Sequence, residues 1–307
     1  MASQRDVRNR IAAVKNIQKI TRAMEMVAAA RLRRAEQRIG ALRPYVGAIR
    51  RMTRTAAGAT GSVPSVPILQ EHEQVNAVGL LLVAGDRGLA GAFNSNIVRA
   101  GVAAGREHEA EGHKVLYFAA GRRPASSLTF RGYEPEQSFV GFSDRPSYAD
   151  ARNIAEHLMA AYADGVVDRV EVFYNGYISP MSQVVRRETL LPLSQATLFD
   201  EGDTSGEQGA QQQEGSGEQP KRINFEYEPD PEAVLRSLVP DYVKLSIYRA
   251  LLESTASEHG ARMTAMRNAS ENAVDLIKGL TLEMNRARQA EITQEIMEVV
   301  AGAEGLA

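Results

Sequence analysis

The two ends of the chain carry its clearest hydrophobic pattern. Over the last fifty residues, apolar or small side chains recur at alternating steps of three and four, which is the spacing of a coiled-coil seam. No proline interrupts this stretch, and helix-forming residues fill much of the remainder. The seam consists of Met263, Met266, Ser270, Ala273, Ile277, Leu280, Met284 and Ala287. A lone helix would expose this stripe to water, so we expect a partner helix.

Residues 3–57 predict that partner, a rod of roughly 80 Å at about 1.5 Å per residue. The apolar residues at the start and at the end of this helix recur at steps of three and four. Those in the middle follow a stripe that is shifted around the helix. The in-register positions are Val7, Ile11, Val14, Ile39, Leu42, Val46 and Ile49, and the shifted ones are Ile17, Ile20, Met24 and Val27. We therefore expect a seam that wanders around the helix, with Pro44 as the point where the rod can bend.

Between the two ends the pattern changes to alternating strands and helices. Apolar runs of strand length alternate with amphipathic stretches, and buried parallel strands read as such unbroken runs. We expect strands at 78–84, 114–119 and 169–174, helices at 95–111, 122–130 and 147–164, and an edge strand at 182–189. The predicted fold class is a central Rossmann-like α/β domain with a mainly parallel sheet, joined to a long antiparallel coiled coil of the N- and C-terminal helices.

Composition divides the chain into six segments. Residues 200–222 contain almost no apolar side chain and predict a disordered polar insertion. Asp230 is a helix cap with Pro231 at the first position, and Pro240 then bends or restarts the helix. The expected segments are a coiled-coil helix (1–58), a linker (59–76), the α/β domain (77–199), the insertion (200–222), a connector with a short helix (223–240) and a second coiled-coil helix (241–307).

Charge is distributed unevenly, although 36 basic and 38 acidic side chains give a net of only -2. Residues 1–54 contain 14 Lys and Arg against three acids, a net of +11, whereas residues 240–307 carry a net of -3. A basic arm on a nearly neutral chain points to an acidic partner surface.

The absence of cysteine excludes disulfides, thiolate metal sites and a thiol switch. The longest uncharged apolar run, residues 75–84, is far below the roughly 20 residues that a membrane-spanning helix requires. The N-terminus is Arg-rich and amphipathic like a mitochondrial transit peptide. That pattern continues for some fifty residues, however, which favours a permanent part of the fold.

Three short motifs suggest chemistry. The loop GDRGLAGAFN, from Gly85 to Asn94, follows a strand as phosphate-binding loops do, but its glycine spacing matches neither dinucleotide nor P-loop patterns, which leaves a tight turn as the alternative. HEAEGH has histidines five apart, and Gly112 ends the helix between them. We therefore expect a solvated helix end rather than a zinc site. The segment around Ser143 lacks the second glycine of a nucleophile elbow.

A basic cluster lies in the N-terminal helix and comprises Arg31, Arg33, Arg34 and Arg38. It could follow a nucleic-acid backbone, but no aromatic residue is interleaved with it. A solvated helix face and an acidic protein partner are the other interpretations, and the acidic partner is the better functional one.

The end segments resemble the gamma subunit of the rotary F-type, H+-transporting ATP synthase. The matching stretches are NIQKITRAMEMVAAARLRRAE, SEHGARMTAMRNASENA, LTLEMNRARQAEITQEIMEVVAGA and the central DRGLAGAFN. The family's C-terminal signature, I-T-x-E-x-x-[DE]-x-x-x-G-A, is matched by Ile292, Thr293, Glu295, Glu298, Gly302 and Ala303. Ala90, Ala92 and Gly305 depart from the family pattern.

This resemblance implies a rotor without bond chemistry and without a cofactor or metal. The end helices would turn inside the ring of alpha and beta subunits, and the α/β domain would lie against the epsilon subunit and the c-subunit ring. The chain would neither enter the membrane nor bind nucleic acid, and would be peripheral on the cytoplasmic face of the bacterial plasma membrane. Carried over by motif, the rotor contacts are Met24, Arg262, Arg288, Gln289, Thr293 and Glu295, with the Arg31–Arg38 face toward acidic partner loops.

Two other functions fit parts of the sequence. An α/β enzyme with helical arms would bind a nucleotide by itself. A basic coiled-coil adaptor would retain DNA or RNA in a salt-sensitive way.

Overall fold

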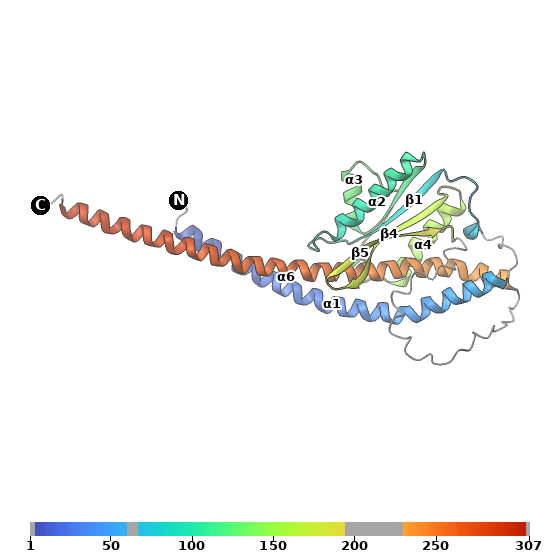
Figure 1. Cartoon of the computed structure of the whole chain (residues 1–307), viewed down its shortest axis with the longest axis horizontal. Helices are drawn as coiled ribbons and strands as arrows, with labels where there is room; N and C mark the ends of the chain where they lie inside the picture. Colours follow the sequence, from blue (N-terminus) through green and yellow to red (C-terminus); the bar gives the residue numbers. More distant parts are fainter. Residues whose placement is uncertain (1–3, 60–66, 194–229, 305–307) are drawn as a thin grey trace, which may run out of the picture.

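The computed structural model describes residues 4–59, 67–193 and 230–304. Two long helices dominate it: α1 (Gln4–Ala59) and α6 (Pro231–Glu304) pack against each other. Figure 1 shows them running in opposite directions, with both termini toward the same end and with α6 reaching past the start of α1. The antiparallel coiled coil predicted from the two ends of the chain is therefore confirmed.

The seam on α1 is straight, and the expectation of a wandering seam was wrong. Ile17, Ile20 and Val27 are 53%, 60% and 53% exposed. Thr21 and Ala28 occupy the seam instead, because small side chains let the helices approach closely although they contribute little hydrophobic signal. The buried positions are separated by three or four residues or by multiples of seven, and include Val7, Ile11, Val14, Thr21, Ala28, Leu32, Ala35, Ile49, Thr53 and Ala56.

The opposite side of the seam follows the predicted positions of α6. Ala273 and Leu280 pack against Val7, Ile11 and Val14 near the open end of the coil. Nearer the base, Ala256 packs against Leu32 and Ala35. Because low numbers on α1 meet high numbers on α6, these contacts establish the antiparallel register.

Helix α6 is continuous from Pro231, so Pro240 does not restart it. Asp230 caps the helix as predicted, since its Oδ1 accepts from the Ala233 amide at 2.8 Å. Val239 and Val243, on either side of the proline, are completely buried. Their packing holds the helix together across the hydrogen bond that proline cannot make.

The α/β domain is built on a five-stranded sheet in the order β3-β2-β1-β4-β5. Strands β1 to β4 are parallel, and β5 pairs antiparallel with β4 at the edge, as predicted. Strand β3 was not predicted because it has only three residues. The elements are η1 (Pro67–Leu69), β1 (Ala77–Val83), α2 (Phe93–Ala110), β2 (Lys114–Ala120), α3 (Arg122–Phe130), β3 (Gln137–Phe139), α4 (Tyr148–Ala163), β4 (Arg169–Ser179) and β5 (Ser182–Leu191).

Helix α6 is shared by the coil and the domain. Successive β1 side chains point to opposite faces of the sheet, so Leu80 lies in the same core cluster as Ile97 of α2, whereas Leu81 lies in the cluster that contains Ile247 of α6. Helices α2 and α3 cover one face, and α4 together with α6 covers the other (Figure 1). The α/β domain and the shaft therefore share one core, which ties them mechanically.

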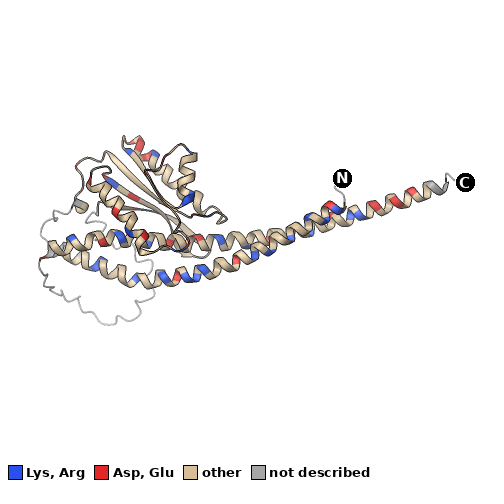
Figure 2. Ribbon diagram, turned by 180° about the vertical axis from the view of Figure 1, so that it is seen from behind, with Lys and Arg blue, Asp and Glu red and all other residues tan. Residues whose placement is uncertain are grey.

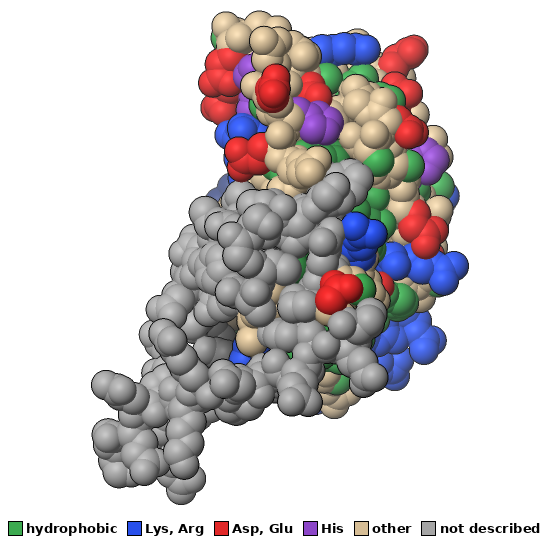
Figure 3. Space-filling model, turned by 90° about the vertical axis from the view of Figure 1, so that its right-hand side faces the viewer, with side chains coloured by type: hydrophobic (Ala, Val, Ile, Leu, Met, Phe, Trp, Pro, Cys, Tyr) green, Lys and Arg blue, Asp and Glu red, His purple; other side chains and the backbone are tan. Residues whose placement is uncertain are grey.

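Basic side chains follow α1, whereas acidic ones occur toward the far end of α6 (Figure 2). At the other end of the molecule, acidic, basic and apolar side chains are mixed over the α/β domain (Figure 3). The predicted insertion at 200–222 lies outside the described residues. Within the described ranges, no helix combines the length and apolar character needed to cross a membrane.

Candidate functional site

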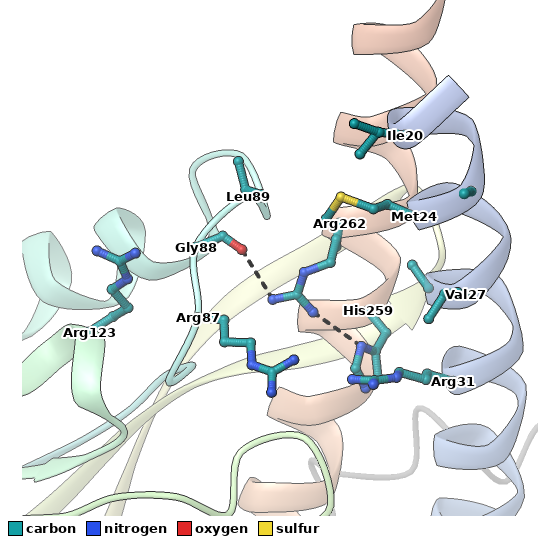
Figure 4. Close-up of a pocket in the computed structure, with 12 residues that line it drawn as sticks. Ile20, Met24, Val27, Arg31, Arg87, Gly88, Leu89, Arg123, His259 and Arg262 are labelled. Atoms are coloured by element: carbon teal, nitrogen blue, oxygen red, sulfur yellow. Dashed lines mark hydrogen bonds between the residues drawn. The ribbon is translucent and has the colours of Figure 1, made fainter. Parts of the chain in front are cut away.

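A hollow of about 530 Å³ lies where the loop after β1 approaches both long helices (Figure 4). The apolar side chains of Ile20, Met24 and Val27 line it from α1. Arg87 of the loop and Arg123 of α3 contribute cationic groups from the α/β domain. An apolar wall beside several guanidinium groups suits an acidic, partly apolar protein segment.

Helix α6 contributes a buried charged cluster to this hollow. Arg262 donates to the Glu258 carboxylate one helical turn away, to the Gly88 carbonyl oxygen at 3.2 Å, and to His259 Nδ1 at 3.3 Å. Burial raises the pKa of Glu258, an effect that the Arg262 charge partly opposes. Burial, with the same guanidinium, lowers the pKa of His259 to about 4. His259 is therefore a neutral acceptor at neutral pH, and Arg262 joins α6 to the loop.

The glycine-rich loop is a structural turn rather than a phosphate cradle. The Gly85 amide donates to Asn94 Oδ1 at 2.8 Å, and the Asp86 amide donates to Ser143 Oγ at 2.9 Å. The Asp86 carboxylate accepts in turn from the amides of Arg122, Gly141 and Ser143. Burial raises the pKa of Asp86, but these hydrogen bonds outweigh it and hold that pKa below its usual value. The first two backbone amides of the loop are thus used within the protein.

The prediction of a solvated helix end at HEAEGH holds for residues 109–112, which are exposed, but was wrong for His108. His108 is 4% exposed, and its ring lies 5.9 Å from that of His113. Gly112 has a φ of 89°, and the His113 amide donates to the His108 carbonyl oxygen at 2.9 Å. This is the Schellman ending of a helix, which returns the chain so that the residue after the glycine contacts the last turn.

The basic face of α1 is divided between two roles. Arg31 pairs with Asp144 of the α/β domain at 2.9 Å, and Arg87 approaches the same carboxylate at 3.3 Å. Arg33 and Arg34 are exposed, and Arg38 is half-buried. Arg31 therefore fastens the domain to the shaft, which leaves its neighbours for an outside partner.

The predicted contact residues fall into two groups. Met24 and Arg262 line the same hollow. Arg288, Gln289, Thr293 and Glu295 lie instead along the exposed last turns of α6. Thr293 Oγ1 donates to the Gln289 carbonyl oxygen at 2.8 Å. Sequence reasoning missed Glu258 and His259, although a Glu and an Arg four residues apart, among small and mostly uncharged residues, signal a buried pair.

Together these features define a mechanical class of protein, in which a rigid antiparallel shaft is locked to a small α/β domain. The family model described as ATP synthase matches residues 3–306. The chain is 41% identical over 306 residues to the ATP synthase gamma chain of Moorella thermoacetica, with all of both chains covered. It is also 41% identical over 310 residues to that of Streptomyces avermitilis, covering 100% of this chain and 97% of the relative. The chain therefore belongs to the ATP synthase gamma-chain family.

Solved structures agree with this assignment. A chain of the Tetrahymena thermophila mitochondrial ATP synthase central stalk and c-ring superposes with a TM-score of 0.59 at 26% identity, covering 82% of this chain and 99% of that one. A Euglena gracilis mitochondrial ATP synthase rotor chain shares the fold, with a TM-score of 0.64 at 21% identity over 94% of this chain and 98% of that one. The protein is thus the rotor component of the central stalk in a membrane-associated complex, and catalysis resides in the beta subunits.

Proposed function

We propose that α1 and α6 turn as an axle inside the ring of alternating alpha and beta subunits, while the α/β domain contacts the epsilon subunit and the c-subunit ring. The main support is the end of α6, where every described side chain from 288 to 301 is exposed in the isolated chain. The large apolar residues there are Ile292, Ile296, Met297, Val299 and Val300, which are 47–72% exposed. An apolar helix end of this kind requires a protein sleeve.

The axle would act through its asymmetry. Each catalytic subunit responds only to the difference in contact free energy between its conformations. Ile20 and Val27 form an apolar stripe on one side of α1, and Arg33 and Arg34 provide charge nearby. A rotating shaft with such unequal sides favours a different conformation in each of three chemically identical subunits.

The rotor contacts would divide into the two groups described above. Met24 and Arg262 line the hollow that receives an acidic loop of a partner subunit. Arg33, Arg34 and Arg38, the neighbours of the paired Arg31, steer that loop by their charge. Arg288, Gln289, Thr293 and Glu295 contact the inner surface of the ring. Exposed charge pairs contribute only about 0–1 kcal/mol each, so the bearing can slip between positions.

Proton flow through the membrane ring would turn the α/β domain, and the shared core would pass the torque to the shaft. The complex would lie on the cytoplasmic face of a bacterial plasma membrane, with this chain peripheral to it. The remaining segments would serve as the linker (59–76), the insertion (200–222) and the connector (223–240).

Charge reversal at Arg288 tests the contact assignment. In the assembled enzyme, Arg288→Glu should lower coupled ATP synthesis while circular dichroism of the chain stays unchanged, because the side chain is exposed. Arg288→Lys keeps the charge and is the matched control. A normal synthesis rate in Arg288→Glu would remove this residue from the contacts. Failure of the full chain to co-purify with alpha and beta subunits from gently solubilised membranes would contradict the axle as a whole.

A further inference from the structure

A cluster of possible metal ligands lies on the α/β domain, and none of its residues lines the hollow. It consists of His108 on the last turn of α2, Glu111 just after that helix, and His113 just before β2. One ligand atom from each of the three residues lies within 4.8 Å of the other two. Neither the rotor contacts nor the Arg262 cluster involves these side chains.

The ligand atoms face one another with a spacing that suits a small cation. Glu111 Oε2 lies 3.5 Å from His108 Nδ1 and 3.5 Å from His113 Nδ1. Four ligands at the usual zinc distances of roughly 2.0–2.1 Å are separated by about 3.4 Å along each edge of the tetrahedron. The carboxylate oxygen therefore already lies at the separation from both nitrogens that a shared ion imposes.

The two Nδ1 atoms also lack other partners. Both are buried, and among the described residues neither Nδ1 has a hydrogen-bond partner. A buried imidazole nitrogen without a partner is costly, and a native structure usually uses such an atom. Since His108 is 4% exposed, its Nδ1 cannot be satisfied by open solvent.

The outer contacts of His108 resemble those of a metal-ligating histidine. Its Nε2 lies 3.2 Å from Glu171 Oε1, and a histidine that donates from one ring nitrogen to a carboxylate keeps the other nitrogen free for a metal. Arg187 Nη2 also approaches Nε2, at 3.1 Å, which would favour the opposite tautomer. Arg187 has other acceptors in Glu171 and Glu107, so it can release the imidazole when a cation binds.

We propose that His108, Glu111 and His113 bind one divalent transition-metal ion of the zinc class. Two imidazoles and one carboxylate match the donor preference of zinc and cobalt and not that of magnesium, which requires oxygen ligands. Glu111 is exposed and His113 partly so, which leaves water a route to the fourth coordination position. The ion joins the end of α2 to the start of β2, next to the ion pair of β4 and β5, and is a structural clamp on the α/β domain.

Titration of the full chain, without a histidine tag, with Zn²⁺ tests this site by calorimetry. We expect one equivalent to bind, Mg²⁺ not to compete, and Co²⁺ to give the visible absorption bands of a low-coordinate site. His113→Gln and Glu111→Gln should each weaken Zn²⁺ binding at least about tenfold, since even outer-shell partners of metal ligands contribute about 10–100-fold. Glu109→Gln, an exposed acid of the same helix end, is the matched control.

Glu111 is exposed and His113 is partly exposed, so the variants should keep the fold, which circular dichroism verifies. Absence of Zn²⁺ binding by the unmodified chain would overturn the proposal. Equal affinity in the unmodified chain, His113→Gln and Glu111→Gln would overturn it as well, because the ion would then bind elsewhere. Either result would leave the rotor assignment untouched.

Discussion

Gly85 faces the buried carboxylate of Glu258 so closely that no side chain fits between them. A Cβ at position 85 would lie 2.8 Å from both Cδ and Oε1 of Glu258. Glu258 is 1% exposed and held by Arg262, so its carboxylate cannot move away freely. The glycine therefore lets the loop after β1 close onto α6, and this contact fastens the α/β domain to the shaft.

We predict that Gly85→Ala destabilises the chain by about 1–3 kcal/mol, the usual result of forcing an extra methyl group into a packed site. The measurement is urea denaturation of the full chain followed by circular dichroism. Gly279→Ala is the control, because nothing lies within 4 Å of a Cβ there. In an exposed helix interior that change should stabilise by about 0.5–1 kcal/mol. Equal stability of Gly85→Ala and the unmodified chain would refute the close contact.

The register of the coil gives a second prediction. Leu32 is 4% exposed in the seam, whereas Ile20 is 60% exposed on the neighbouring stripe. Leu32→Ala should therefore cost about 2–5 kcal/mol of unfolding free energy, and Ile20→Ala no more than about 0.5 kcal/mol. Thermal and urea denaturation of the two variants decide between registers, since a wandering seam would make the Ile20 change comparably destabilising. In the assembled enzyme, Ile20→Ala should still lower coupled synthesis.

Secondary structure was predicted correctly from the sequence wherever the hydrophobic pattern was long or strongly apolar. Both end helices, the parallel strands β1, β2 and β4, and the Asp230 cap follow from periodicity and local chemistry. Prediction failed where small residues make the contact between the helices, because Thr21 and Ala28 contribute little to a hydrophobic pattern yet are buried in the seam.

The candidate site was only partly predictable for a related reason. Met24 and Arg262 are 238 positions apart, and only the antiparallel register brings both to one hollow. The convergence of His108 and His113 depends on the φ of Gly112, and a spacing rule for straight helices does not include it. Which side chains come together therefore depends on the register of the two long helices and on the geometry of turns, and the spacing of residues along the sequence gives neither.

A third prediction concerns Asp168, which ties the segment before β1 to the start of β4. Its Oδ2 accepts from the amides of Asn76 and Ala77 at 2.8 Å each, and its Oδ1 lies 2.6 Å from His72 Nδ1. Asp168→Ala leaves these donors unpaired and should cost about 1–3 kcal/mol, measured by urea denaturation. Asp168→Asn keeps an acceptor oxygen and should cost less.

Asp164→Ala serves as the control for that experiment. Asp164 is exposed at the C-terminal end of α4, where a negative charge opposes the helix dipole. Its removal should change the free energy of unfolding by no more than about 0.5 kcal/mol. If Asp168→Ala were equally harmless, the network around Asp168 would contribute nothing to stability.

The last prediction is a loss of stability in mild acid caused by His259. Burial, followed by the Arg262 charge, lowers the pKa of His259 from 6.5 to about 4 in the folded chain. Above pH 6.5 the residue is neutral in both states and has no effect. As the pH falls from 6.5 to 4, the unfolded chain takes up a proton that the folded chain refuses, so unfolding becomes easier by up to about 3 kcal/mol.

Comparison with His259→Asn isolates this contribution, because asparagine does not titrate and keeps an acceptor for Arg262. As the pH falls from 6.5 to 4, the unmodified chain should lose unfolding free energy relative to the variant. Below pH 4 the difference between the two chains should stay constant. Glu258 acts in the opposite direction, since its raised pKa makes the folded state take up a proton first, but both chains contain it and its effect largely cancels. Parallel stability curves for the two chains over this range would show that His259 protonates freely and is not buried against Arg262.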